Sequence, residues 1–249
     1  MIQALWERIL SNYYLVSTVI LGLTGVILFI FLPRQKKAKP QFYLPFLILV
    51  LVVFYEILAV NMIVNKPLNE RIHYLLTSDP YKGWNSWVFN IFNYLLSKIL
   101  FLLLIRVNLK NPTRRKIVHF LIGILILGGI VLTISGIEKI HEPQPIFYFI
   151  SNITLIIASG FFFMDLISED YFLSLNPVQF LPFWYISLIL FQSVLTLLAD
   201  VAFEYLAFNR VDIYFLFNYT SMILYFLLSI VFNTLFYLGR NNFLKNSEI

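Results

Sequence analysis

Residues 41–64 read QFYLPFLILVLVVFYEILAVNMIV, and a single residue in this stretch, Glu56, is charged. A helix that spans a lipid bilayer needs about 20 consecutive, mostly apolar residues, so the stretch predicts a transmembrane helix. The whole chain has the same character, with 60% hydrophobic and 12% charged residues. Soluble domains contain roughly 45–50% apolar and 25% charged residues. We therefore predict an all-α membrane protein that has the lipid bilayer as a partner.

Seven segments of this kind follow one another along the chain. They lie near residues 11–32, 42–64, 86–106, 117–135, 145–166, 180–200 and 212–238. Barrel strands do not fit, because they are about ten residues long and alternate in polarity. The loop after the second segment contains an amphipathic stretch near 67–77, which predicts a short helix on the membrane surface. The chain is predicted to form a single seven-helix domain, residues 1–249.

The lysines and arginines between the segments are unevenly distributed. Eleven lie on the side that the chain reaches after the first segment, and six lie on the side of the N-terminus. Because basic loops stay in the cytoplasm, the N-terminus is predicted to lie outside and the C-terminus in the cytoplasm. Abundant Ile, Leu, Phe, Tyr, Asn and Lys are typical of an AT-rich genome, so we expect a bacterial protein of the inner membrane. Basic residues at helix ends account for the net charge of +5, so we expect no nucleic-acid partner.

Three of the predicted helices carry polar residues at helical spacing. The stripes are Asn90, Asn93, Tyr94, Ser97 and Lys98 in the third helix, Ser193, Thr196, Asp200 and Glu204 in the sixth, and Asn218, Ser221, Tyr225, Ser229 and Asn233 in the seventh. Polar groups are costly in contact with lipid, so the stripes are expected to face the interior of the bundle. There they either join helices through hydrogen bonds or line a functional site.

Glu56 lies in the outer half of the second helix, and Lys98 lies a little below mid-membrane in the third. Helical side chains lean toward the N-terminus of their own helix, so these two lean toward each other's depth. An intramembrane ion pair between Glu56 and Lys98 is one hypothesis. The other two are a protonated Glu56 and a carboxylate at the foot of a water-filled cavity.

The polar stripes also predict a ligand site. We expect a cavity that opens to the outside between the second, third, sixth and seventh helices. Its predicted lining is Glu56, Asn90, Asn93, Asp200 and Asn218. Concave, largely apolar surfaces with a few converging polar groups are typical of small-ligand sites. The acidic residues favour a small cationic or polar ligand over an anion, and Lys98 at the floor moderates that preference.

Several kinds of chemistry lack their residues in this sequence. There are no cysteines, and His73, His119 and His141 are scattered over both sides of the membrane, so we expect neither a metal site nor a cofactor. No hydrolase, metalloprotease or nucleotide-binding motif occurs, which argues against an enzyme without excluding one. A cluster of acidic residues ends the fifth helix, and we expect it to be a solvated helix end rather than a metal site. It consists of Asp165, Glu169 and Asp170.

Two stretches far apart in the chain resemble each other. Pro40, Leu44, Pro45 and Phe46 recur with a constant offset at Pro177, Leu181, Pro182 and Phe183. This repeat predicts two parallel three-helix units joined by the fourth helix. The plan resembles the layout of the SWEET and PQ-loop transporters, although the proline expected in the middle of the first and fifth helices is absent. The resemblance implies paired prolines and a substrate pocket on the third helix of each unit. By position these are Pro45 with Pro182, and Asn93 with Asn218.

Two functions are compatible with these features. One is a sensory or regulatory module, or a membrane-complex subunit, that passes a signal to a cytoplasmic or membrane partner protein. The stretch after the seventh helix, RNNFLKNSEI, contains no domain, so such a sensor is expected to signal through another protein. The alternative is a small-solute transporter built from paired three-helix units, which needs no partner.

Overall fold

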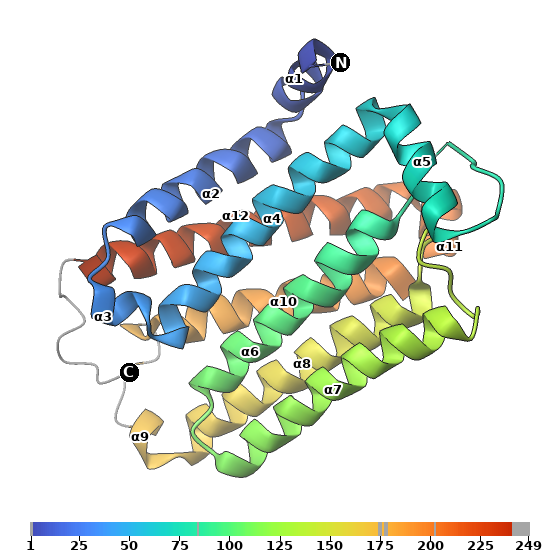
Figure 1. The fold of residues 1–249 in the computed structure, drawn as a ribbon. Helices are drawn as coiled ribbons and strands as arrows, with labels where there is room; N and C mark the ends of the chain where they lie inside the picture. The colour runs from blue at the N-terminus through green and yellow to red at the C-terminus, as the bar shows by residue number, and fades with distance from the viewer. Residues whose placement is uncertain (1, 84, 174–175, 177–178, 202, 241–249) are drawn as a thin grey trace.

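The structure is a computed structural model that describes residues 2–83, 85–173, 176, 179–201 and 203–240. In these ranges every regular element is a helix, and seven helices are long and apolar enough to cross a membrane. They are α2 (Tyr13–Ile30), α4 (Pro40–Val64), η1 continued by α6 (Phe89–Ser97 and Lys98–Asn108), α7 (Pro112–Ile134), α8 (Pro145–Ser168), α10 (Leu181–Val201) and α12 (Val211–Arg240) (Figure 1). The prediction of an all-α chain is confirmed for the described residues, as is the prediction of seven helices long and apolar enough to span a membrane.

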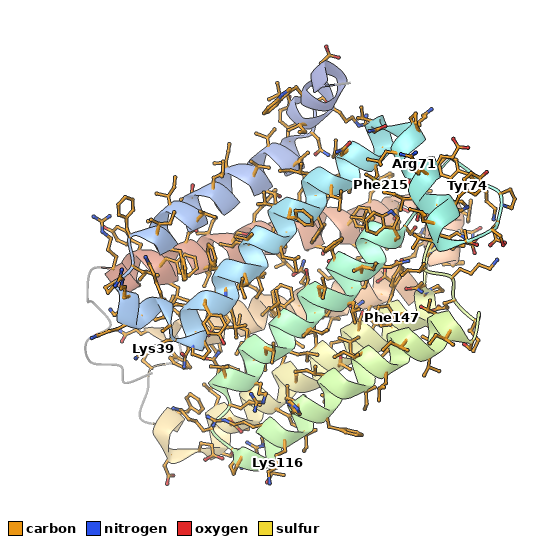
Figure 2. The ribbon with its side chains drawn as sticks, viewed as in Figure 1. Lys39, Arg71, Tyr74, Lys116, Phe147 and Phe215 are labelled. Carbon is orange, nitrogen blue, oxygen red and sulfur yellow. The ribbon has the colours of Figure 1, made fainter. Side chains whose placement is uncertain are left out.

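Shorter helices lie at the two ends of the bundle. They are α1 (Ile2–Leu10), α3 (Arg34–Lys37), α5 (Lys66–Leu76), α9 (Asp170–Leu173) and α11 (Phe203–Asn209). Figure 2 shows Lys39 and Lys116 at one end of the bundle and Arg71 and Tyr74 at the other, and we name these the α3 end and the α5 end. Helix α5 occupies the stretch predicted near 67–77. Its Leu68 packs against the bundle but its Leu75 is 80% exposed, so only part of the predicted apolar face is buried.

Local sequence signals explain where the spanning helices begin. Prolines occupy the first turns of α4, α7 and α8, where the missing N–H has no partner to lose. The Asn12 side chain accepts a hydrogen bond from the Leu15 N–H at 3.2 Å and starts α2. Asn111 starts α7 by accepting from two N–H groups in its first turn.

Six of the spanning helices form a closed ring. Each helix contacts the next in the order α2, α4, α6, α8, α10, α12, and α12 returns to contact α2. The fourth spanning helix, α7, lies outside the ring and packs on α6 and α8 (Figure 1). Near the α3 end, completely buried side chains such as Ile105, Phe232 and Phe236 fill the ring. Of the repeated prolines, Pro45 lies inside α4 and Pro182 lies in α10, whereas Pro177 lies outside the described residues.

Helix α2 approaches its neighbour α4 through two glycines. A Cβ atom at Gly22 would lie 2.3 Å from Val53 Cγ2, and one at Gly25 would lie 2.5 Å from Leu49 Cδ1. Beside the same Gly25, the Asn233 amide of α12 donates a hydrogen bond to the Leu21 carbonyl of α2 at 3.1 Å. Small residues and interhelical hydrogen bonds are the usual means of helix association in lipid. Asn233 thus joins two helices through a hydrogen bond, which was one of the two roles expected for the polar stripes.

Asp165, near the end of α8, is completely buried. Its carboxylate accepts hydrogen bonds from the backbone N–H groups of Lys110 and Asn111, at 2.6 and 3.1 Å, and forms an ion pair with Arg114. It thereby fastens the turn between α6 and α7 to α8. The expectation of a solvated helix end is wrong for Asp165, because this turn folds over the carboxylate.

Candidate functional site

A polar cavity of about 410 Å³ lies inside the ring near the α5 end. Residues of α4, η1, α6, α10 and α12 line it, and the first turn of α2 adds Tyr14. The second, third, sixth and seventh spanning helices, which the sequence analysis selected, therefore form most of its wall. Small-molecule sites usually have volumes of about 300–1,000 Å³. The cavity has the size of a site for a small ligand.

The cavity brings together most of the residues that the sequence analysis proposed for the ligand site and the ion pair. Those that line it are Glu56 of α4, Asn93 of η1, Lys98 of α6, Asp200 of α10 and Asn218 of α12. Other members of the predicted stripes that line it are Tyr94, Ser97, Thr196, Ser221 and Tyr225. The side chain of Glu204 lies outside the described residues.

Asn90 does not line this cavity. Its amide donates hydrogen bonds to the carbonyls of Ile140 and Glu142, both at 2.8 Å, and its side-chain oxygen accepts one from the Tyr148 hydroxyl at 2.6 Å. These contacts hold the loop between α7 and α8 against η1. Asn90, which was predicted in the ligand site, therefore lies outside the cavity lined by Glu56 and contacts the loop before α8 instead.

The type of helix explains the position of Asn90. Residues Phe89–Ser97 form a π-helix, in which the backbone hydrogen bonds span five residues instead of four. Each turn therefore holds more residues than an α-helical turn, so residues three positions apart, such as Asn90 and Asn93, no longer share a face. Asn93 faces the cavity, whereas Asn90 faces α8 and the loop before it. π-helical turns occur frequently at functional sites.

The predicted ion pair between Glu56 and Lys98 is not formed. The Lys98 ammonium instead donates a hydrogen bond to the Asn152 side-chain oxygen at 3.0 Å and lies 5.8 Å from the centre of the Tyr94 ring. The Asn152 amide in turn donates to the Asp200 carboxylate at 3.3 Å. Lys98 is thus linked to Asp200 through one amide, because it turns toward α8 rather than toward α4.

Asn152 is the member of this network that the sequence analysis missed. It lies in α8, inside the run IFYFISNITLII of residues 146–157, and is completely buried. Asn152 is not part of a row of polar residues at helical spacing, so the sequence pattern did not indicate it. Asn152 could still have been identified, because burying an amide within a membrane-spanning helix is unfavourable unless another helix supplies a polar partner. Lys98 and Asp200 are the charged residues that needed such a partner.

A stacked pair of tyrosines extends the network toward the α5 end. The Tyr94 hydroxyl donates to both oxygens of the Asp200 carboxylate, at 3.2 and 3.0 Å. The ring centroids of Tyr94 and Tyr148 are 3.7 Å apart, and the Tyr148 hydroxyl reaches Asn90. One continuous set of contacts therefore connects Lys98 at the cavity with the loop between α7 and α8.

Glu56 has a different environment from Asp200. Among the described residues, no lysine, arginine or histidine nitrogen lies within 4.0 Å of its carboxylate. The phenol side chains of Tyr14, Tyr55 and Tyr225 line the same cavity as Glu56. The Tyr55 hydroxyl also donates to Asn93 at 3.4 Å. Glu56 therefore faces the cavity without a counter-charge from the part of the protein that the structure describes.

Outside the spanning segments, an ionic cluster joins two loops at the α5 end. Lys139 donates to Asp79 at 2.5 Å, and Lys82 donates to Glu142 at 3.1 Å. The Lys139 ammonium holds the pKa of the Asp79 carboxyl below its usual value, and Lys82 does the same to the pKa of Glu142. The cluster ties the loop after α5 to the loop between α7 and α8.

Two of the histidines meet beside this cluster. The ring centroids of His73 and His141 are 4.8 Å apart, so the prediction that the histidines are scattered is wrong for this pair. They meet because the chain after α5 lies against the loop before α8. Burial and the neighbouring His73 lower the pKa of His141, which favours its neutral form. Within the described part of the chain, no group of His, Asp and Glu is arranged to hold a metal ion.

A double-mutant cycle can test the link between Lys98 and Asp200. Lys98→Met is expected to lower the free energy of unfolding by about 2 kcal/mol, because Asp200 loses its counter-charge. Adding Asp200→Asn should restore at least about 1 kcal/mol, the coupling expected for residues in one network. Glu56→Gln combined with Lys98→Met should instead be additive within about 0.5 kcal/mol. SDS-induced unfolding in mixed micelles measures all three; coupling only in the Glu56 cycle would contradict the observed network.

The chain matches no protein-family model, no curated protein and no solved structure. A seven-helix fold alone does not define a function, so function is inferred from the chemistry of the cavity. Its lining contains the carboxylates of Glu56 and Asp200, the amine of Lys98 and many hydroxyl and amide groups. Such a lining can bind a polar molecule through hydrogen bonds and charge.

Proposed function

We propose that this protein is a membrane receptor, a sensory or regulatory subunit that binds a small polar ligand and passes the signal to a partner protein. The observation that carries the proposal is that the cavity ends inside the ring. Val52, Phe101 and Tyr225 belong to its lining, and beyond them the ring contains buried side chains such as Ile105 and Phe232. Among the described residues, packed side chains thus separate the cavity from the α3 end, which supports a binding site that is open to one side.

The network around the cavity provides a route for the signal. Lys98, Asn152 and Asp200 connect α6, α8 and α10, so a ligand that displaces one of these side chains changes the contacts of three helices. The π-helix η1 is a second candidate for movement, because its conversion to an α-helix would rotate the residues before α6. A ligand with different affinity for the two arrangements shifts their populations. The shift would reach the partner through the long helices.

The proposed orientation places the α5 end outside the cell and the α3 end in the cytoplasm. Its support is the basic sequence at the α3 end, which includes Arg34–Lys37 and the first turns of α7. Short basic loops mark the cytoplasmic side of inner-membrane proteins. In this orientation the N-terminus lies outside and the cavity opens to the periplasm of a bacterial cell.

A small-solute transporter with two three-helix units is the second candidate. The contacts within α2, α4 and α6 have counterparts within α8, α10 and α12. The two contacts that close the ring, α6 with α8 and α12 with α2, are also counterparts. Carriers with parallel repeats use this kind of pairing. A carrier must open its site to both sides in turn, which would require the packed α3 half to separate.

Single cysteines distinguish the two candidates, because the chain has no natural cysteine. Asn93→Cys and Asn218→Cys are expected to react with an impermeant thiol reagent applied to the outside of spheroplasts. In inverted vesicles they should not react. Lys82→Cys, in an exposed loop, is the positive control, and Ser229→Cys, at a position 1% exposed, is the negative control.

The side of labelling decides between the outcomes. Reaction of the cavity cysteines from both sides would support the transporter, and reaction from the cytoplasmic side alone would reverse the orientation. Failure to react from either side, with Lys82→Cys fully labelled, would refute an open cavity and with it the proposed function.

A further inference from the structure

The structure assigns a chemical class to the ligand: a small molecule with one ammonium group, which the Glu56 carboxylate binds, and a neutral hydrogen-bonding group at its other end. This inference rests on the proposed function and specifies the ligand of the same cavity. It depends on three features of the lining, namely its unbalanced charge, its aromatic rings and an unpaired hydroxyl group.

The charged groups that line the cavity do not cancel. Lys98 and Asp200 balance each other through Asn152, so their charges need no ligand. Glu56 has no cationic group of the described chain within 4.0 Å. A partly buried carboxylate without a counter-charge is unfavourable, and either protonation or a bound monovalent cation removes the imbalance. A zwitterion would leave the net charge unchanged, and an anion would increase it.

Aromatic side chains line the same cavity as this carboxylate. Tyr14, Tyr55 and Tyr225 all line the cavity. Phe89 also lines it and packs edge-on against Tyr55, with ring centroids 6.3 Å apart. Ring faces attract organic cations, and protein sites for ammonium groups are often built from several such rings. An ammonium group at Glu56 can therefore contact rings and carboxylate together.

The cavity also contains a buried hydroxyl group without a partner. Ser97 is 1% exposed and lines the cavity, yet its hydroxyl makes no hydrogen bond to any described residue. Buried polar groups are nearly always hydrogen-bonded. The Ser97 oxygen has almost no accessible surface, so a ligand can pair with it only after the side chain rotates toward the cavity. Ser97 lies on η1, whereas Glu56 lies on α4. One ligand can satisfy both if it carries an ammonium group at one end and a hydroxyl or ether oxygen at the other.

Three probes of nearly equal size test this assignment on the purified full-length chain in lipid nanodiscs. They are 4-amino-1-butanol, 1,4-butanediol and 4-hydroxybutyrate, which are cationic, neutral and anionic at pH 7. Calorimetry and thermal unfolding are expected to show binding of the amine at least ten times tighter than that of the diol, and no binding of the acid. Glu56→Gln should weaken amine binding at least tenfold without changing diol binding. Glu142→Gln, on the outer loop, is the matched control and should change neither.

Wild-type selectivity decides the question even if Glu56→Gln does not fold. Equal affinity for amine and diol, or preference for the acid, would overturn the ammonium ligand while leaving a ligand-binding cavity in place. Binding of none of the probes to a protein whose Asn218→Cys variant reacts from outside would also reject this inference and not the proposed function. If the cysteines placed in the cavity did not react from either side, the proposed function itself would be refuted.

Discussion

Asp165→Ala is expected to lower the free energy of unfolding by about 3 kcal/mol, because it leaves the charge of Arg114 and two backbone N–H groups without their acceptor. The carboxylate is completely buried, and Arg114 keeps only 18% of its side chain exposed, so water cannot replace the lost contacts fully. The turn between α6 and α7 should detach from α8 first. SDS-induced unfolding measures the stability, and limited proteolysis at the turn measures the detachment.

Asp170→Ala is the matched control for this experiment. Asp170 lies five residues further along the chain, and its side chain is exposed. Substitutions at exposed positions of this kind usually change stability by less than about 0.5 kcal/mol. Equal effects of Asp165→Ala and Asp170→Ala would show that the acidic cluster is a solvated helix end after all, as the sequence analysis expected.

The double substitution Gly22→Ala with Gly25→Ala is expected to destabilise the protein by about 2 kcal/mol or more. The new Cβ atoms would lie 2.3 Å from Val53 Cγ2 and 2.5 Å from Leu49 Cδ1, well inside van der Waals contact. Val53 is β-branched and has little freedom to rotate within a helix. The Cβ at position 25 would also lie 2.8 Å from Asn233 Oδ1 of α12. Helix α2 is therefore expected to move away from α4 and from this contact with α12. Unfolding in mixed micelles gives the free energy, and a crosslink between α2 and α4 reports the separation.

Gly123→Ala and Gly160→Ala provide the comparison within the same protein. Both glycines lie in helices, and a Cβ at either position meets no atom within 4 Å. These substitutions should be neutral or stabilising, by up to about 1 kcal/mol, because alanine favours the helix more than glycine does. If all the alanine variants behaved alike, close contact between α2 and α4 would not explain the need for glycine.

The candidate site was predictable in part. Polar residues in membrane helices are costly, and this cost alone identified Glu56, Asn93, Asp200 and Asn218 as residues of the bundle interior. Their meeting in one cavity depends on the order of helices in the ring, which no short stretch of sequence encodes. Asn90 lies outside this cavity. The prediction had assumed α-helical spacing, whereas this part of the chain forms a π-helix.

The sequence by itself determined the class of the protein and the positions of its seven spanning segments. These follow from local properties, since each segment must be long and apolar enough to cross lipid regardless of its neighbours. Prolines and asparagines at the helix starts also act locally, because they stabilise only the first turn of their own helix.

Only the tertiary structure decided which polar groups meet. Lys98 bonds to Asn152 across 54 positions, and Tyr94 bonds to Asp200 across 106. Such contacts depend on the rotation and the order of packed helices, which are set by the shape of every neighbouring surface together. Judged only by its predicted depth in the membrane, Glu56 was as good a partner for Lys98 as Asn152. The packed ring directs Lys98 toward α8, so Glu56 faces the cavity without a basic partner within 4.0 Å among the described residues.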